Sequence, residues 1–488
     1  MRIAIVAAEI GPWAKAGGLA DVIGALPRAL ASRGAEACVI APAYPALTAA
    51  LETKQIGDSR AIEMGGANES YRVLGARTPA GIPLFLVDHP EMFGRAGIYD
   101  ENGKEYPDNA RRFIFFGRAA AAIAADLARP DVIHAHDWHA AATVLAMRAE
   151  QALRDRMKST LAVFTIHNLA FQGIFESHDF PLLGVDWSWY SVDVLEFWGR
   201  VNLMKGAIVL ADGVSTVSPT YAWEIAHDPE LGFGLDGVLR TKGDRLTGIL
   251  NGADYDEWDP ARDHLIPKPY SPRRRANKKY CLDVLRDDLR LPHPAKSAAV
   301  PMIGMVTRMT PQKGVDILAD ALDALMALDI QLVMLASGDP ALEKIFQQAG
   351  ERYPDRMRLI TGFDSSLAHR IMAASNMFLM PSRFEPCGLT QMYALRYGAA
   401  PIVRATGGLR DTVSEFNPRT RTGNGFVFSE YDPAALSGAV ARAVEIFRHP
   451  AKWQVLVGNC FRSDYSWDRA AGQYLQWFER LRAERSAG

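Results

Sequence analysis

A lysine and an aspartate flank a glycine pair near the start of this chain, at residues 15–21 (KAGGLAD). Glycines let a backbone approach a ligand closely, and free N–H groups at a helix start attract an anion. Lys15 adds a positive charge, so Lys15, Gly18 and Asp21 could bind a phosphorylated ligand. The spacing is not GxGxxG, however, and a plain turn between a strand and a helix accounts for this segment equally well.

Two further segments place histidine beside carboxylate or amide groups. Residues 134–139 read HAHDWH, but this spacing is not HExxH, and we expect Asp137 at a strand end rather than a metal site. Residues 165–173 read TIHNLAFQG. His167, Asn168 and Gln172 there could supply the directed hydrogen bonds that a sugar needs. A hydrogen-bonded histidine in the core is the alternative.

Cations recur in the second half, at residues 306–314 (VTRMTPQKG). Arg308 and Lys313 flank a predicted turn between a strand and a helix. Together they could neutralise a diphosphate, the arginine as a planar fork and the lysine as a point charge. Solvated charges at a strand end are the alternative.

An acidic residue and a second glycine pair follow. In residues 383–395 (RFEPCGLTQMYAL), Glu385 precedes a helix start at Gly388, Leu389 and Thr390, whose N–H groups could hold phosphate. Glu385 could accept hydrogen bonds from sugar hydroxyls or merely cap its own helix. The pair Gly407-Gly408 opens another helix and is similar to the first glycine turn.

These turns need elements that bring strand ends together. Short β-rich runs alternate with amphipathic helical patterns, which is typical of βαβ units and parallel sheets. We predict strands at 3–7, 36–40, 83–87, 132–135, 162–166 and 213–217, and again at 301–307, 331–337, 357–362, 377–381, 400–404 and 425–428. Ligands of doubly wound sheets bind beyond the carboxyl ends of the strands, which is where the segments described above fall.

A chain of 488 residues is too long for one core, so we predict two α/β domains, each with a doubly wound sheet. The Asp- and Pro-rich stretch at 251–272 lacks periodicity and predicts a linker. We place an N-terminal Rossmann-like domain at 1–255, a hinge at 256–297 and a C-terminal Rossmann-like domain at 298–464. A last helical pattern near 465–485 could pack back on the first domain.

Composition excludes several classes of protein. With a net charge of −2, no global field favours nucleic acid or an anionic membrane. Four scattered cysteines form no CxxC pair, so we expect neither a disulfide framework nor a zinc site, and a cytoplasmic location. The first residues do not form a signal-peptide pattern, and no apolar run reaches transmembrane length.

In their order, the motifs resemble those of bacterial glycogen synthases and plant starch synthases, the retaining glycosyltransferases of family 5. The resemblance covers nearly the whole chain and is carried by KAGGLADV, HAHDWH, TIHNLAFQG, GILNGAD, VTRMTPQKG, RFEPCGLTQMYAL and TGGLRDTV. It implies a GT-B fold, in which two Rossmann-like domains face a central cleft and the last helix crosses back. It also implies transfer of glucose from ADP-glucose to the nonreducing 4-OH of an α-1,4-glucan such as glycogen, without a metal or other cofactor.

The resemblance also implies roles for residues. The catalytic set is Glu385, His167, Asp137, Arg308 and Lys313, and the substrate-binding set is Lys15, Gly18, Asp21, Asn168, Gln172, Asn251, Gly388, Leu389 and Thr390. Two positions depart from wider patterns. Ala16 stands where the family usually has Thr or Val. Tyr393 stands where many retaining GT-B enzymes have a second glutamate, a replacement that is usual in this family.

Other functions remain open on the sequence alone. A related GT-B transferase could use UDP-glucose or a small-sugar acceptor instead. A Rossmann dehydrogenase would need GxGxxG and an acidic partner about 20 residues later, and the first turn supplies neither in that form. A non-catalytic glucan-binding protein would not need two cations together with Glu385.

Overall fold

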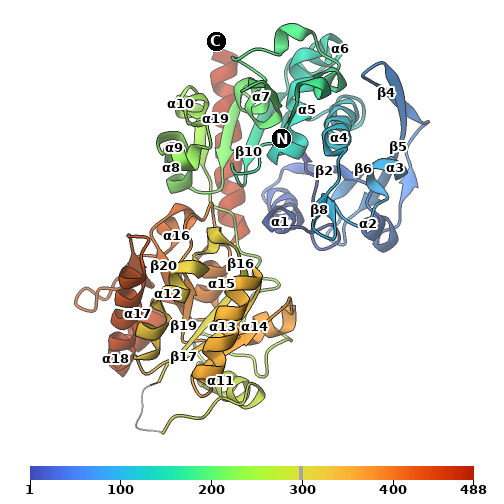
Figure 1. Cartoon of the computed structure of the whole chain (residues 1–488). Coiled ribbons are helices and arrows are strands. Elements are labelled where there is room, and N and C mark those ends of the chain that lie inside the picture. The colour runs from blue at the N-terminus through green and yellow to red at the C-terminus, as the bar shows by residue number, and fades with distance from the viewer. Residues whose placement is uncertain (296–299, 488) are drawn as a thin grey trace. The chain divides into compact units, whose positions relative to one another are not determined.

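The computed structural model describes residues 1–295 and 300–487, and the chain forms two compact units (Figure 1). Unit 1 comprises Met1–Gly252 and Trp467–Gly488, and unit 2 comprises Ala253–Ser466. Each unit has its own sheet with helices packed on it, so the predicted α/β class with two Rossmann-like sheets is confirmed. The predicted domain boundary at 297–298 lies outside the described residues.

Unit 1 is built on a ten-stranded sheet in the order β15-β14-β10-β9-β1-β2-β6-β5-β3, with β4 paired to β5. Pairing is parallel from β15 to β6 and antiparallel among β6, β5, β3 and β4. The strands are β1 Arg2–Val6, β2 Glu36–Pro42, β3 Lys54–Gln55, β4 Arg60–Met64, β5 Ala67–Arg77, β6 Pro83–Asp88, β9 Val132–His136, β10 Leu161–Ile166, β14 Gly213–Thr216 and β15 Leu246–Gly248. Strand order reverses at β1, which lies between β2 and β9.

The helices of unit 1 alternate with these strands. They are α1 Gly18–Ser32, α2 Pro45–Ala50, α3 Pro90–Phe93, α4 Asn109–Ile123, α5 Asp137–Ala149, α6 Gln151–Arg156, α7 Leu203–Leu210, α8 Pro219–His227, α9 Pro229–Gly232, α10 Asp236–Arg240 and α19 Trp467–Ala487. Short hairpins are formed by β7 Asp100–Glu101 with β8 Lys104–Glu105, and by β11 Ile174–Glu176, β12 Glu196–Phe197 and β13 Arg200–Asn202. A π-helical turn, Ala124–Ala128, follows α4.

Helix α19 comes last in the chain but belongs to unit 1 (Figure 1). Its buried side chains Tyr474, Trp477, Phe478 and Leu481 recur at helical spacing and so form one apolar face. Tyr474 and Phe478 lie with ring centroids 5.2 and 5.4 Å from that of His134 in β9. At the other end, Asp468 pairs with an arginine, Arg33, that follows α1, at 2.7 Å.

Unit 2 is built on six parallel strands in the order β18-β17-β16-β19-β20-β21. They are β16 Met302–Met309, β17 Gln331–Gly338, β18 Met357–Ile360, β19 Met377–Met380, β20 Ala400–Arg404 and β21 Phe426–Phe428. The helices are α11 Ala276–Asp288, α12 Val315–Met326, α13 Pro340–Arg352, α14 Ser365–Ala374, α15 Thr390–Arg396, α16 Gly407–Thr412, α17 Pro433–Phe447 and α18 Pro450–Arg462. Strand order reverses between β16 and β19, which pair with each other.

The segment predicted as a linker, 251–272, contains no helix or strand, and from residue 253 onward it packs within unit 2. Buried Asp263 accepts hydrogen bonds from His369 Nδ1 at 2.8 Å and from the Tyr397 hydroxyl at 2.5 Å. The Tyr270 hydroxyl donates to the carbonyl of Tyr397 at 2.8 Å. From residue 253 onward this stretch is therefore part of unit 2 rather than a free connection. Composition suggested a linker because these buried polar contacts leave no periodic pattern.

Within residues 1–295 and 300–487, no helix has the length and apolar character that crossing a membrane would require.

Candidate active site

The turn after β1 carries the first predicted site residues. Lys15 is exposed, and its Nζ donates to Asp21 Oδ1 at 2.6 Å. Asp21 lies in the first turn of α1, where a carboxylate is favoured by the helix dipole. Gly18 is the first residue of that helix. The structure thus brings Lys15, Gly18 and Asp21 together at the carboxyl end of β1, in the position that ligand turns occupy in doubly wound sheets.

Glu9 holds this turn in shape. Its Oε2 accepts the backbone N–H groups of Ala16 at 2.9 Å and Gly17 at 2.8 Å, and its Oε1 accepts the Tyr99 hydroxyl at 2.8 Å. Only 4% of Glu9 is exposed, so the carboxylate is dedicated to these donors. Glu9 is not among the site residues predicted from the motifs. Its signal was a lone acid in the otherwise apolar run VAAEIGPW, directly after a predicted strand.

The two glycine pairs look alike in sequence but differ in structure. Apart from the chain neighbours of Gly18 and the adjoining backbone of α1, no described atom lies within 4 Å of the place that a Cβ on Gly18 would take. A Cβ on Gly407 would lie 2.0 Å from the carbonyl oxygen of Glu385, and one on Gly408 would lie 2.0 Å from that of Cys387. The second pair therefore allows α16 to pack closely on the backbone at Glu385 and Cys387, where a Cβ would not fit. In the first pair, Gly18 leaves open space.

Asp137 and His167 meet at the ends of β9 and β10. Asp137 begins α5 in the left-handed region at φ 57°, and its Oδ1 accepts the backbone N–H of His167 at 2.7 Å. Burial raises the pKa of Asp137 to about 7 and lowers the pKa of His167 to about 3. His167 Nε2 is hydrogen bonded to His136 Nδ1 at 2.8 Å, and its Nδ1 has no partner among the described residues. A neutral imidazole is therefore available to a sugar hydroxyl.

The three predicted amide side chains differ in how far the protein already uses them. The Oδ1 of Asn168 accepts the N–H of Ala170 at 3.1 Å. Gln172 is engaged at both ends, donating to Phe233 O at 3.1 Å and accepting from Asn202 at 2.6 Å. Asn251 is only 6% exposed, and its Oδ1 has no hydrogen-bond partner within the described part of the chain. A buried oxygen of this kind needs a donor, which a bound ligand could supply.

A pocket in unit 2 gathers the predicted cations. It has a volume of about 190 Å³ and is lined by Met305, Val306, Thr307, Arg308, Lys313, Leu379, Met380, Ser382 and Thr390. Arg308 lies in β16, and Ser382 follows β19, so the pocket lies at the carboxyl ends of the two strands where strand order reverses. Thr390, which is far in sequence from Arg308 and Lys313, therefore shares one pocket with them.

Glu385 lies next to this pocket and is joined to it by an ion pair. Lys313 Nζ donates to both carboxylate oxygens of Glu385, at 2.9 and 2.7 Å, and Ser382 Oγ donates to Oε2 at 2.9 Å. Glu385 is 6% exposed, so the pair is largely shielded from water. The carboxylate of Glu385 is thus bound by the side chains of Lys313 and Ser382. A glutamate that only capped its own helix would not need these two partners.

The turn before α15 contains the remaining predicted residues. Gly388 adopts φ 70°, in the left-handed region that favours glycine, and Leu389 directly precedes the helix that starts at Thr390. Tyr393 is buried one turn later and stacks on Trp258, with ring centroids 4.4 Å apart. Tyr393 therefore packs on the segment that follows residue 252 and does not enter the pocket lining.

No cluster of three or more His, Cys, Asp or Glu suited to a metal is found within the described ranges.

Comparison with known proteins shows to which family this chain belongs. A sequence model of the family "Starch synthase catalytic domain" matches residues 2–241, and one for "Glycosyl transferases group 1" matches residues 292–454. The chain is 44% identical over 490 residues to a glycogen synthase of Anaeromyxobacter dehalogenans, covering 99% of this chain and 100% of that protein. The chain belongs to the glycogen synthase family.

Further relatives agree with this assignment. The glycogen synthase 1 of Methylococcus capsulatus is 41% identical over 498 residues, covering 100% of this chain and 98% of that one. The solved catalytic domain of starch synthase IV from Arabidopsis thaliana, bound to ADP and acarbose, aligns with a TM-score of 0.89 at 32% identity over 99% of both chains. The chain is therefore a glycosyltransferase of the glycogen synthase family with a GT-B fold, as the motifs predict.

Proposed function

We propose that this glycosyltransferase lengthens an α-1,4-glucan by transferring glucose from ADP-glucose to the nonreducing 4-OH, with retention of configuration. The observation that carries the proposal is the unit 2 pocket, where Arg308, Lys313 and Thr390 converge beside Glu385. Two cations suit a diphosphate, and a shielded carboxylate beside them suits sugar hydroxyls. The relatives named glycogen synthase, and the starch synthase solved with ADP and acarbose, support the same substrates.

Arg308 and Lys313 stabilise the charge that develops on ADP when the bond between glucose and phosphate breaks. Donors positioned where charge develops are worth most in a site that excludes water. Lys313 is held at the pocket by both oxygens of Glu385, so its side chain needs little reordering when phosphate binds. Gly388, Leu389 and Thr390 add backbone N–H groups to the same end of the donor.

Unit 1 contributes the side chains that bind the sugar, and it also contributes a positively charged side chain, that of Lys15. Lys15, with Asp21 as its partner, binds the donor phosphate beside the open space at Gly18. His167 and Asp137 bind glucose hydroxyls, with Asn168 and Asn251 as further hydrogen-bond partners. Gln172, engaged by Phe233 and Asn202, positions its loop rather than the substrate.

Retention requires attack from the face that ADP leaves. A retaining glycosidase achieves this with a pair of carboxylates, one of which attacks the sugar. Glu385 is tied to Lys313 and Ser382, and we assign it to orientation and electrostatic stabilisation. The acceptor hydroxyl then attacks the anomeric carbon on the departing face, and the leaving phosphate takes its proton.

A donor assay tests the proposal. The purified protein is incubated with glycogen and either ADP-glucose or UDP-glucose, and nucleotide release and glucose incorporation are measured. Faster transfer from ADP-glucose into glycogen supports the proposal. Preference for UDP-glucose, or transfer only to a small sugar, would establish the alternative GT-B activity. Binding of glycogen without transfer from either donor would make the chain a glucan-binding protein.

The proposal places the protein in the cytoplasm, where ADP-glucose and glycogen would be its partners. Within the described residues, no disulfide involves Cys38, Cys281, Cys387 or Cys460, which suits a reducing compartment. Nucleic acid and membranes are not among the proposed partners.

A further inference from the structure

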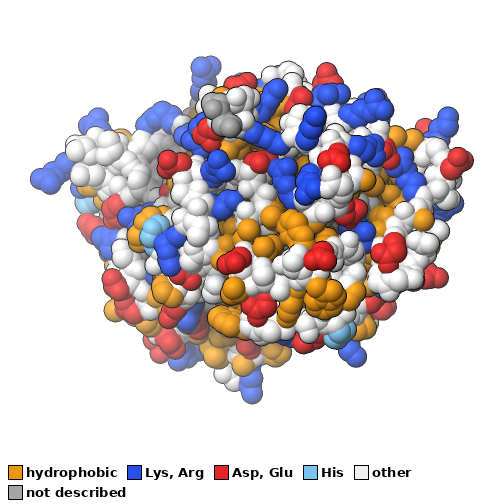
Figure 2. All heavy atoms as spheres, turned by 90° about the horizontal axis from the view of Figure 1, so that it is seen from above, with side chains coloured by type: hydrophobic (Ala, Val, Ile, Leu, Met, Phe, Trp, Pro, Cys, Tyr) orange, Lys and Arg blue, Asp and Glu red, His pale blue; other side chains and the backbone are white. Residues whose placement is uncertain are grey.

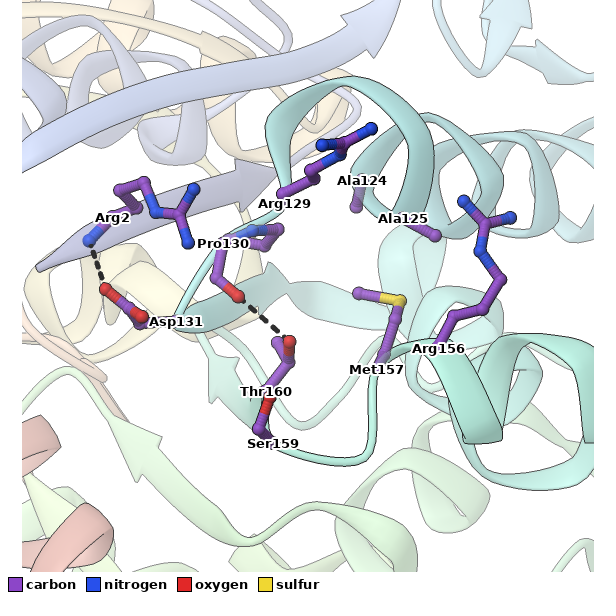
Figure 3. Close-up of a pocket in the computed structure, with 10 residues that line it drawn as sticks. All are labelled: Arg2, Ala124, Ala125, Arg129, Pro130, Asp131, Arg156, Met157, Ser159 and Thr160. Atoms are coloured by element: carbon purple, nitrogen blue, oxygen red, sulfur yellow. Dashed lines mark hydrogen bonds between the residues drawn. The ribbon is translucent and has the colours of Figure 1, made fainter.

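A second pocket lies in unit 1 (Figure 3). Its volume is about 380 Å³, and it is lined by Arg2, Ala124, Ala125, Arg129, Pro130, Asp131, Arg156, Met157, Ser159 and Thr160. This size is within the range of pockets that hold small organic ligands. None of these residues belongs to the predicted site.

The pocket lies at the edge of the sheet opposite to the catalytic turns. Arg2 is the first residue of β1, Asp131 directly precedes β9, and Thr160 directly precedes β10. Asp137 and His167 follow the other ends of β9 and β10. A strand as long as β9 spans about 16 Å. The pocket and the catalytic turns therefore lie at opposite ends of the strands, about one strand length apart.

Three arginines surround this hollow (Figure 3). Arg156 pairs with Asp126, which also pairs with Arg60, so one carboxylate is shared by two guanidinium groups. Arg129 Nε donates to the backbone carbonyl of Asp126 at 3.3 Å. Within the described ranges neither Arg2 nor Arg129 has a carboxylate partner for its guanidinium. The lining therefore carries more positive charge than its neighbours neutralise.

This excess is local. The chain has a net charge of −2, and on the face drawn in Figure 2 basic and acidic side chains are intermingled. Three guanidinium groups around one hollow are thus not the result of a generally basic surface. Arginine presents planar donors that match phosphate oxygens.

The other residues that line the pocket could bind the hydroxyl groups and the carbon skeleton of a ligand. Asp131 Oδ2 accepts the backbone N–H of Arg2 at 2.7 Å, which leaves its other oxygen for a ligand hydroxyl. Ser159 is exposed at the rim, and Thr160 Oγ is turned to the carbonyl of Pro130 at 2.9 Å. Ala124, Ala125, Pro130 and Met157 are buried and line the pocket with apolar groups. Phosphate donors, one hydroxyl acceptor and apolar groups together suit a sugar with one phosphate group.

We propose that this pocket binds a sugar monophosphate, with the phosphate held by Arg2, Arg129 and Arg156 and the hydroxyls by Asp131 and Ser159. The binding is separate from the donor site in unit 2 and does not depend on the proposed glucosyl transfer.

Isothermal titration calorimetry on the full chain tests the proposal with fructose 6-phosphate, fructose and inorganic phosphate. We expect one saturable site for fructose 6-phosphate and at least about tenfold weaker binding of the other two, because each lacks half of the contacts. Equal binding of inorganic phosphate would mean an adventitious ion only. Absence of binding, or displacement by ADP-glucose, would also overturn the proposal.

Variants locate the binding. Arg129→Ala combined with Arg156→Ala should weaken fructose 6-phosphate at least about tenfold, while Arg154→Ala, on the same helix but outside the pocket, should leave it unchanged. Glucosyl transfer and the unfolding midpoint, measured without fructose 6-phosphate, should match the wild type in both variants. Unchanged affinity in the double variant would overturn the proposal, and so would equal loss in Arg154→Ala.

Discussion

At the scale of single residues, the pair formed by Lys313 and Glu385 joins a phosphate-binding cation to a carboxylate in a site shielded from water. Both oxygens of Glu385 accept from the ammonium group, and Ser382 adds a third hydrogen bond. Such a carboxylate is oriented by its partners and has little freedom to attack a sugar. Its loss removes both a negative charge and the group that positions Lys313.

Glu385→Gln should therefore lower kcat at least about 100-fold, the scale of a lost electrostatic stabiliser. Glucose incorporation from saturating ADP-glucose measures this. Glu351→Gln, at an exposed position of α13, should leave kcat unchanged. A nearly normal rate in Glu385→Gln would contradict the assigned role. A trapped covalent glucosyl adduct on Glu385 would establish double displacement instead.

At the scale of elements, the two glycine turns show how similar sequences serve different purposes. Gly18 starts α1 beside open space, whereas Gly408 brings α16 against the backbone at Cys387. The hydrogen bonds to Glu9 hold the first turn in shape, so this shape does not require the absence of a Cβ at Gly18.

Alanine substitutions separate these purposes. Gly18→Ala should leave the unfolding midpoint unchanged and raise the KM for ADP-glucose more than the KM for glycogen, because a methyl group would occupy the ligand space. Gly408→Ala should lower the free energy of unfolding by about 1–3 kcal/mol, the cost of overpacking. Thermal unfolding and steady-state kinetics of both variants check this. Equal destabilisation by the two substitutions would contradict the distinction.

A buried ion pair attaches residues 253–272 to unit 2. Burial alone would lower the pKa of His369, but its hydrogen bond to Asp263 and the nearby carboxylate of Glu257, at 3.8 Å, outweigh this effect and raise the pKa to about 9. Burial would likewise raise the pKa of Asp263, yet its hydrogen bonds to His369 and Tyr397 lower it overall. The pair therefore stabilises the fold between the pKa of Asp263 and that of His369.

Unfolding as a function of pH tests this pair. The folded pKa of His369 is above its usual value of 6.5, so its contribution is complete below pH 6.5 and is lost as the pH rises through about 9. The difference in urea midpoint between the wild type and His369→Gln should shrink between pH 6.5 and pH 10. A difference that is constant over this range would show that the pair does not titrate as described.

At the scale of the whole molecule, chain order and structural unit diverge at the C-terminus. Helix α19 follows unit 2 in sequence but completes the core of unit 1. Its residues Trp477 and Leu481 lie against Gly213 of β14, where a Cβ would be only 2.5 Å from Leu481. The stability of unit 1 therefore depends on a helix that follows unit 2 in the sequence.

Phe478→Ala should destabilise unit 1 by about 3–5 kcal/mol, the usual cost of deleting a buried aromatic side chain. Hydrogen exchange should show the loss of protection in β9 and β14 and not in the strands of unit 2. Arg482→Ala, exposed on the same helix, should change stability by less than about 0.5 kcal/mol. Loss of protection spread equally over both units would contradict this division of the chain.

The sequence by itself determined the fold class, the family and most of the candidate site. Alternating strand and helix periods mark βαβ units, and strand ends carry Lys15, Asp137, His167 and Arg308, because parallel sheets gather ligand groups at one edge. The motif around Glu385 indicates this residue, and the two cations that flank a predicted turn indicate its partner Lys313.

Only the tertiary structure decided which of these groups touch. The ion pair between Lys313 and Glu385 joins residues 72 positions apart. The hydrogen bonds that the backbone N–H groups of Ala16 and Gly17 donate to Glu9 follow from a turn whose shape no local pattern shows. The arginine pocket joins the starts of β1, β9 and β10, which are distant in sequence and become neighbours only because β9 pairs with both β1 and β10. Contacts of this kind depend on strand order, and strand order is set by the packing of the whole sheet.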